Sequence, residues 1–122
     1  MIQRGTNLIV ADNTGAKSIR CFNILVGTGH RYAKIGDIII ASVKKVEPRK
    51  SIKKKEIVRA VIVRQRKEFK RRDGTYIRFD DNAAVILDGK TNTQRGGRIF
   101  GPIPRELKEK FPGIIAIAPE VV

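Results

Sequence analysis

Two clusters of lysine and arginine are the residues of this chain whose type and spacing most clearly indicate a ligand. The first cluster contains Arg49, Lys50, Lys53, Lys54 and Lys55. The second contains Arg64, Arg66, Lys67, Lys70, Arg71 and Arg72. Cations in this number attract a polyanion, because neutralising its phosphates releases condensed counterions. One such cluster is common on a solvated turn, whereas two clusters with few acids between them favour contact with RNA or DNA.

The other reactive side chains are too few for catalysis. His30 is the only histidine, which excludes a metal site built on a histidine pair. Cys21 is the only cysteine, and its apolar neighbours predict a buried thiol. A two-metal nuclease needs several converging carboxylates, whereas Asp80 and Asp81 would point to opposite faces of a strand. We therefore expect no catalytic residue, metal or cofactor, and a nuclease that uses Asp80 and Asp88 is the weakest alternative.

Composition describes a single folded domain with a strong positive charge. The chain has 122 residues, 41% of them hydrophobic, and a net charge of +14. This length predicts one domain over residues 1–122 with one substantial core. The longest apolar run, Ile38 to Ala41, is too short to span a bilayer, and Met1 to Arg4 lack the apolar stretch of a secretory signal. We expect a soluble protein of a reducing compartment.

The elements that must position the cations are mostly strands. Short β-branched runs alternate with Gly, Asp, Asn and Pro, and they predict strands at 7–11, 19–26, 35–46, 57–66, 75–79 and 83–88. The nearly continuous apolar character of 35–46 predicts burial on both faces for part of its length. Asp73-Gly74 predicts a type I′ hairpin turn, with positive φ at both residues. No helical pattern separates the first five runs, so a barrel or sandwich is favoured.

Only the C-terminal region has a helical pattern. Pro104 suits a first helical position, and Leu107 and Phe111 lie one turn apart on a common face. We expect this helix to end at Pro112-Gly113 and to be followed by a last strand at 114–118.

Aromatic residues are sparse, with five Phe, two Tyr and no Trp. Phe22, Phe79 and Phe100 lie in apolar context, which predicts that they belong to the core. Tyr32 and Tyr76 adjoin arginines and could stack on bases. This balance favours recognition of folded RNA by shape and phosphate contacts. The alternative is a free oligonucleotide-binding barrel that acts as an RNA-binding regulator and stacks bases on these tyrosines.

Characteristic motifs are spread over the whole chain. They are Ala11-Asp12-Asn13-Thr14-Gly15-Ala16, Arg31-Tyr32-Ala33, Ile35-Gly36-Asp37, Ala60-Val61-Ile62-Val63, Asp73-Gly74, Phe79, Asn82, Val85-Ile86, Arg98-Ile99-Phe100-Gly101-Pro102, Arg105-Glu106-Leu107 and Ala118-Pro119-Glu120-Val121. Together they resemble one known family, that of the fourteenth protein of the large ribosomal subunit. Agreement at so many separated places makes the resemblance specific.

The resemblance implies an all-β fold, a five-stranded closed β-barrel with a small C-terminal part, about 103–122, that contains one or two short helices. It implies a structural constituent of the large ribosomal subunit, and not an enzyme, that binds large-subunit rRNA directly and forms intersubunit bridges with small-subunit rRNA. It also implies packing against the nineteenth large-subunit protein and docking of a ribosome-silencing factor. The expected location is the ribosome of the bacterial cytoplasm, of a plastid or of another organelle.

The residues expected at these interfaces fall into two sets. The rRNA-binding set is Asn13, Lys17, His30, Arg31, Lys44, Lys45, Arg49, Lys50, Lys53, Lys54, Arg64, Arg66, Lys67, Lys70, Arg71, Arg72 and Arg78. The protein-partner set is Gly97, Arg98, Phe100, Arg105 and Ala116. Bacterial relatives usually carry Thr at the position of Gly97 and often Ser at that of Ala116. The segment 47–56 is also more basic than usual and lacks the common Gly-Asp before the fourth strand.

Overall fold

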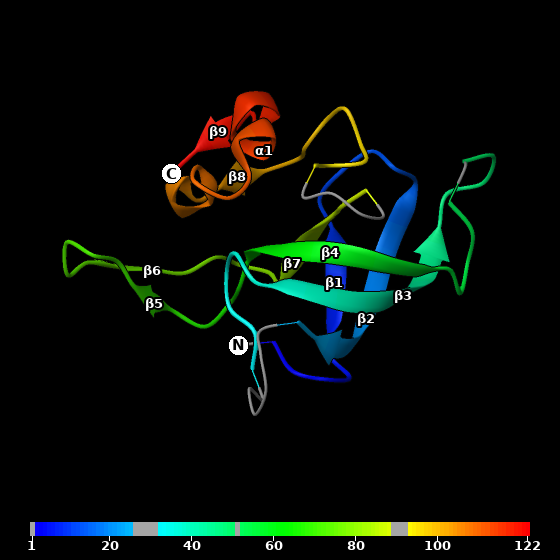
Figure 1. Cartoon of the computed structure of the whole chain (residues 1–122), viewed down its shortest axis with the longest axis horizontal. Coiled ribbons are helices and arrows are strands. Elements are labelled where there is room, and N and C mark those ends of the chain that lie inside the picture. Colours follow the sequence, from blue (N-terminus) through cyan, green and yellow to red (C-terminus); the bar gives the residue numbers. More distant parts are fainter. Residues whose placement is uncertain (1, 26–31, 51, 89–92) are drawn as a thin grey trace.

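A closed five-stranded barrel forms the centre of the molecule (Figure 1). The computed structural model describes residues 2–25, 32–50, 52–88 and 93–122. In barrel order the strands are β1 (Asn7–Val10), β2 (Ala16–Ile24), β3 (Ile38–Val46), β4 (Ile57–Arg64) and β7 (Ala83–Ile86). Neighbours are antiparallel except β1 and β7, whose parallel pairing closes the barrel. The predicted all-β barrel is confirmed.

Two smaller sheets lie outside the barrel. Strands β5 (Phe69–Lys70) and β6 (Tyr76–Ile77) form a hairpin that projects from one end of the molecule (Figure 1). Strands β8 (Pro102–Ile103) and β9 (Glu120–Val121) pair in parallel within the small C-terminal part. That part also contains a 3-10 helix, η1 (Arg105–Leu107), and the short helix α1 (Pro112–Ile117).

The C-terminal helix differs from the sequence-based prediction. Pro112 begins α1 instead of ending a helix, and 114–118, predicted as a strand, is mostly helical. Proline is favoured in the first helical turn, because its missing N–H has no partner there in any case. The β-branched residues that suggested a strand pack instead into the core, where Ile114 is fully buried. Tertiary packing thus overrides a weak local preference.

Two apolar clusters share the wall formed by β3, β4 and β7. Along β4, Ala60 and Ile62 point into the barrel, whereas Val61 and Val63 face the C-terminal part. Ile38 and Ile39 divide in the same way on β3, so the predicted two-sided burial of this strand is confirmed. Phe111, Leu107 and Ile114 cover the outer side of the wall. The C-terminal part is therefore fixed to the barrel by a second core.

The aromatic side chains are less buried than their sequence context predicted. Phe22 is 45% and Phe100 is 49% exposed, so their assignment to the core is wrong, and Phe79 is half-buried. Phe22 follows buried Cys21 on β2, so the alternation of side chains along the strand points its ring outward. Cys21 is buried as predicted, and burial raises the pKa of its thiol.

The tip of the β5–β6 hairpin is a three-residue loop. Arg71 donates its backbone N–H to the carbonyl oxygen of Thr75 at 2.7 Å, and Gly74 donates to that of Arg71 at 3.0 Å. Gly74 has a φ of 88°, whereas Asp73 does not lie in the left-handed region, so the predicted type I′ turn is wrong. The Asp73 carboxylate accepts hydrogen bonds from the backbone and hydroxyl of Thr75, at 3.1 and 2.6 Å. This arrangement matches a turn followed by a glycine bulge.

Candidate nucleic-acid interface

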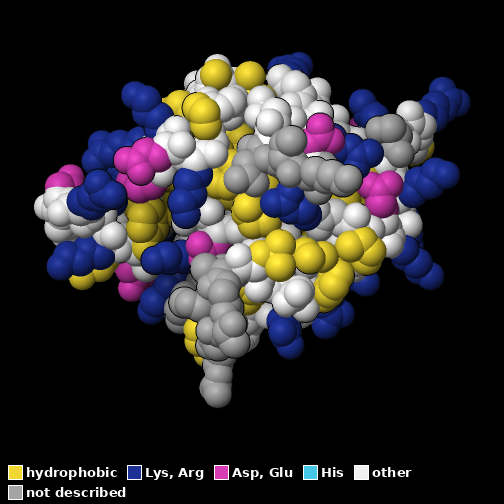
Figure 2. Space-filling view, viewed as in Figure 1, with side chains coloured by type: hydrophobic (Ala, Val, Ile, Leu, Met, Phe, Trp, Pro, Cys, Tyr) yellow, Lys and Arg dark blue, Asp and Glu magenta, His cyan; other side chains and the backbone are white. Residues whose placement is uncertain are grey.

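Exposed cations gather at two opposite ends of the molecule. The β3–β4 connection carries the loop cluster, defined as Arg49, Lys50, Lys53, Lys54 and Lys55, all exposed. The hairpin and its base carry the hairpin cluster, defined as Arg66, Lys67, Lys70, Arg72 and Arg78, also exposed. Figure 2 shows lysine and arginine side chains at both ends of the long axis. Strand β4 separates the clusters, and its 8 residues span roughly 26 Å.

The loop cluster is held outward by its apolar and backbone contacts. Ile52 is 2% exposed and anchors the connection in the barrel core. The Glu47 N–H donates to the Gly15 carbonyl oxygen at 2.7 Å, which fixes the start of the connection. Arg49 and Lys55 adopt left-handed backbone conformations, with φ of 67° and 69°. Sharp turns at these residues leave the cations in solvent.

Lysines on the barrel extend the loop cluster. Lys44 and Lys45 lie near the end of β3, and Lys17 lies at the start of β2. All three are exposed, and Lys45 is paired in the sheet with Ser18, the neighbour of Lys17. Cations that were predicted from three separate stretches therefore share one end of the barrel.

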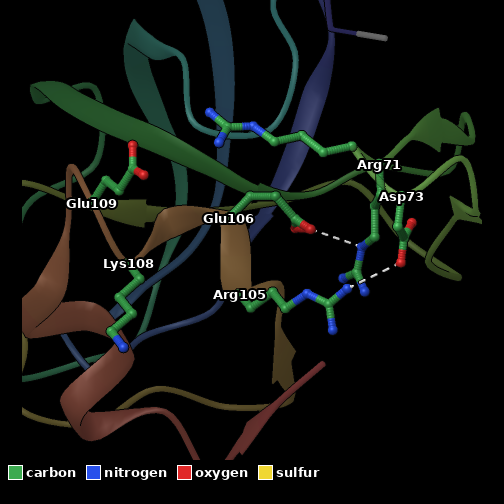
Figure 3. A pocket seen from close by; sticks show the side chains of 7 residues that line it. Arg71, Asp73, Arg105, Glu106, Lys108 and Glu109 are labelled. Carbon is green, nitrogen blue, oxygen red and sulfur yellow. Dashed lines mark ion pairs between the residues drawn. The ribbon is translucent and has the colours of Figure 1, made fainter.

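The tip of the hairpin is tied to the C-terminal part by two ion pairs (Figure 3). Arg71 Nε lies 2.7 Å from Glu106 Oε1, and Arg105 Nη2 lies 3.6 Å from Asp73 Oδ2. The hairpin contributes Arg71 and Asp73, and the C-terminal part contributes Arg105 and Glu106, to the lining of a pocket of about 360 Å³. The Arg71 side chain is only 10% exposed, and its Nη2 makes no hydrogen bond to any described residue. Arg71 thus faces the C-terminal part rather than open solvent.

Arg64 also faces inward, which removes it from the surface at which RNA contacts were expected. Its residue is 7% exposed, and its Nε donates to Asp81 Oδ1 at 2.9 Å. Its Nη1 donates to the carbonyl oxygens of Phe100, at 2.9 Å, and Pro102, at 3.2 Å. A Cβ on Gly101 would lie 2.3 Å from that Nη1, so glycine is required there. This glycine was the only sign in the sequence that a large group lies close by.

Asn13 holds a neighbouring loop in place. Its Oδ1 accepts hydrogen bonds from the backbone N–H groups of Gly97 and Arg98, at 3.0 and 3.1 Å. Asp12 beside it is buried, and its Oδ2 accepts from the Ile86 N–H at 2.9 Å. Burial raises the pKa of the Asp12 carboxyl, although its hydrogen bonds act in the opposite direction. The turn that begins at Asp12 therefore positions the loop that contains Gly97.

The residues expected at a protein interface are all exposed, namely Gly97, Arg98, Phe100, Arg105 and Ala116. The guanidinium carbon of Arg98 lies 5.8 Å from the centroid of the Phe100 ring, within cation–π range. Two expected rRNA contacts, His30 and Arg31, lie outside the described residues. Tyr32 and Tyr76 are 48% and 66% exposed but lie on separate elements, so they form no stacking row.

Within the ranges that the structure describes, no group of three His, Cys, Asp or Glu residues could hold a metal ion. No helix in these ranges is long and apolar enough to cross a membrane.

The model of the family described as Ribosomal protein L14p/L23e matches residues 1–122.

Proposed function

Because the chain belongs to the Ribosomal protein L14p/L23e family, we propose that it binds large-subunit rRNA directly, through the loop cluster and the hairpin cluster. Membership makes it a structural protein of the large ribosomal subunit, associated with rRNA and other ribosomal proteins, and not an enzyme. The observation that carries the proposal is the placement of exposed cations at both ends of a rigid barrel.

The two ends are suited to different segments of RNA. Cations separated by the length of β4 cannot neutralise the same few phosphates, so each cluster contacts its own segment. Linking two weak contacts through one scaffold raises the effective concentration of the second contact. The protein thereby holds two RNA segments in fixed relation, and contact of one end with small-subunit rRNA would form an intersubunit bridge.

The mechanism is electrostatic positioning, in which no bond is made or broken. The hairpin cluster contains three arginines, whose planar groups can grip phosphate oxygens in a bidentate manner. The loop cluster is mainly lysine and acts as a set of point charges. The proposed rRNA contacts also include Lys17, Lys44 and Lys45, the barrel lysines that extend the loop cluster. His30 and Arg31 are proposed rRNA contacts as well. Asn13 and Arg71 act by positioning the loop and hairpin that they hold.

The protein-partner surface is a further part of the proposal. Gly97, Arg98, Phe100, Arg105 and Ala116 would meet the nineteenth large-subunit protein or a ribosome-silencing factor. Exposed Arg98 supports this, because arginines are enriched among the residues that dominate binding energy at protein interfaces. We propose ribosomes of bacteria, or of an organelle of bacterial type, as the location.

The salt dependence of RNA binding tests the central proposal. If about six phosphates are neutralised, the logarithm of the affinity for a large-subunit rRNA fragment falls with log salt at a slope near −5. Isothermal titration at several salt concentrations measures this slope. An affinity that does not change with salt would contradict phosphate neutralisation.

A further inference from the structure

A cleft of about 460 Å³ lies between the base of the hairpin and the segment before β8. Phe79 and Asp80 line it on the hairpin side, and Phe100 and Pro102 line it on the other. Phe100 lines the cleft and is 49% exposed, a large exposure for an apolar side chain. Exposed apolar surface within a cleft that also carries a few polar groups is typical of binding sites.

Hydrogen bonds from one buried arginine hold the two walls of this cleft at a fixed distance. Arg64 lies at the bottom and hydrogen-bonds to Asp81 on one wall, and to the carbonyls of Phe100 and Pro102 on the other. Because the residue is 7% exposed and its guanidinium already makes these three hydrogen bonds, it is not free to bind an ion from solvent. The cleft is therefore preformed, and a ligand would not have to pay for ordering it.

The chemistry of the walls fits a planar, weakly polar ring. Phe100 and Phe79 supply aromatic surface, and the Arg98 guanidinium lies 5.8 Å from the Phe100 ring centroid. Exposed Arg78 lines the cleft, and Arg66 donates from Nε to the Asp80 carbonyl oxygen at 3.1 Å, which places a second exposed cation beside it. The exposed Asp80 carboxylate can accept hydrogen bonds from N–H groups at the edge of a base. Unpaired nucleobases bind proteins through these contacts, by stacking on aromatic rings and arginine planes.

We propose that this cleft binds one unpaired nucleobase of RNA, with the face of the base against Phe100 and its edge toward Asp80. The inference rests on the proposed RNA-binding function and deepens it, since the phosphate clusters alone have no means of preferring a bulged nucleotide. The exposed cations beside the cleft, Arg78 and Arg66, contact the phosphates on either side of the base. Phe100 also belongs to the proposed protein-partner surface, so RNA in this cleft would compete with a protein for that ring.

The experiment compares two hairpin RNAs with identical phosphates. One carries a single bulged adenosine, and in the other the same nucleotide is abasic. We expect the protein to bind the first RNA about tenfold more tightly, which is the size of one base–aromatic stack. A 2-aminopurine at the bulge should lose fluorescence as it stacks.

Two matched variants locate the effect. Phe100→Leu keeps an apolar side chain without a π-face, and we expect it to bind both RNAs with the affinity of the wild type for the abasic RNA. Phe22→Leu makes the same change on β2, at a ring that is 45% exposed and away from the cleft, and should keep the tenfold preference. Thermal unfolding checks that both variants are folded.

The outcomes separate this site from the phosphate clusters. Equal affinity of the wild type for both RNAs, with a steep salt dependence, would overturn the nucleobase site alone. Equal loss of preference in both variants would also overturn it. Absence of salt-dependent binding to either RNA would contradict the proposed function as well.

Discussion

The side chain of Arg64 makes three hydrogen bonds that join segments far apart in the sequence. It connects the end of β4 to Asp81 and to the segment that contains Phe100 and Pro102. A guanidinium can do this because it presents several donors in a fixed plane, which a lysine ammonium lacks. The first residue of a basic run thus stabilises the fold, while the exposed cations that follow it remain available to a polyanion.

Replacing Arg64 by Met should therefore lower stability without a large effect on phosphate binding. The substitution keeps most of the buried volume but leaves Asp81 and two carbonyl oxygens without their donor. We expect a loss of about 2–4 kcal/mol in the free energy of unfolding. Urea denaturation followed by circular dichroism measures it. The control is Arg66→Met, at an exposed arginine two positions along, which should change stability by less than about 0.5 kcal/mol.

The sequence could not reveal the role of Arg64. Charge runs indicate that cations are numerous, but burial depends on segments that approach from elsewhere in the chain. The same limit explains Phe22 and Phe100, whose apolar neighbours suggested the core although both rings are about half exposed. Gly101 was the one indication in the sequence. A glycine before Pro102 is consistent with a tight backbone turn and also with a large group packed close to its Cα.

The connection between β3 and β4 contains two left-handed residues that are not glycine, Arg49 and Lys55. Side chains with a Cβ are strained in this conformation, at a cost of about 1–2 kcal/mol. Lys55 occupies the place at which the resemblance had indicated a Gly-Asp pair before this strand. The chain therefore keeps the turn and carries an additional cation at the expense of backbone strain.

Lys55→Gly should stabilise the protein, because it relieves this strain. Glycine also increases the entropy of the unfolded chain, so we expect a net gain of about 0.5–1 kcal/mol. The control is Lys54→Gly, which removes the same charge at a residue without positive φ and should lose a similar amount. Chemical denaturation of both variants gives the comparison. If Lys55→Gly is as destabilising as Lys54→Gly, the strain is relieved in some other way.

Elements were predictable where pattern and topology agree. The β-branched runs between turn residues placed all five barrel strands, because each strand has a face in the barrel interior. The C-terminal part was harder to predict. Its residues are apolar because they pack in the second core, and not because they form a strand. Pro112 could end one helix or begin another, and only the packing of Phe111 and Ile114 decides between them.

At the scale of the whole molecule, the barrel keeps the loop cluster and the hairpin cluster apart. A closed barrel has no free edges and resists bending, so the distance between its ends is fixed. The hairpin could swing, but the pairs Arg71–Glu106 and Arg105–Asp73 tie its tip to the C-terminal part. The second core in turn fixes that part to β4 and β7.

This rigidity predicts that the two clusters contribute independently to RNA binding. Neutralising Lys53 and Lys54 to Gln should weaken binding to large-subunit rRNA and make the salt slope shallower by about 2. Neutralising Lys67 and Lys70 to Gln should do the same, and the fourfold variant should show the sum, because well-separated sites are additive. An RNA stem shorter than the barrel can contact only one cluster at a time. Each double variant should therefore still bind such a stem through the cluster that it keeps. Lys34→Gln with Lys110→Gln, which removes the same charge outside both clusters, should change each slope little. If one double variant binds like the wild type and the fourfold variant is no weaker than the other double variant, one end alone meets the RNA.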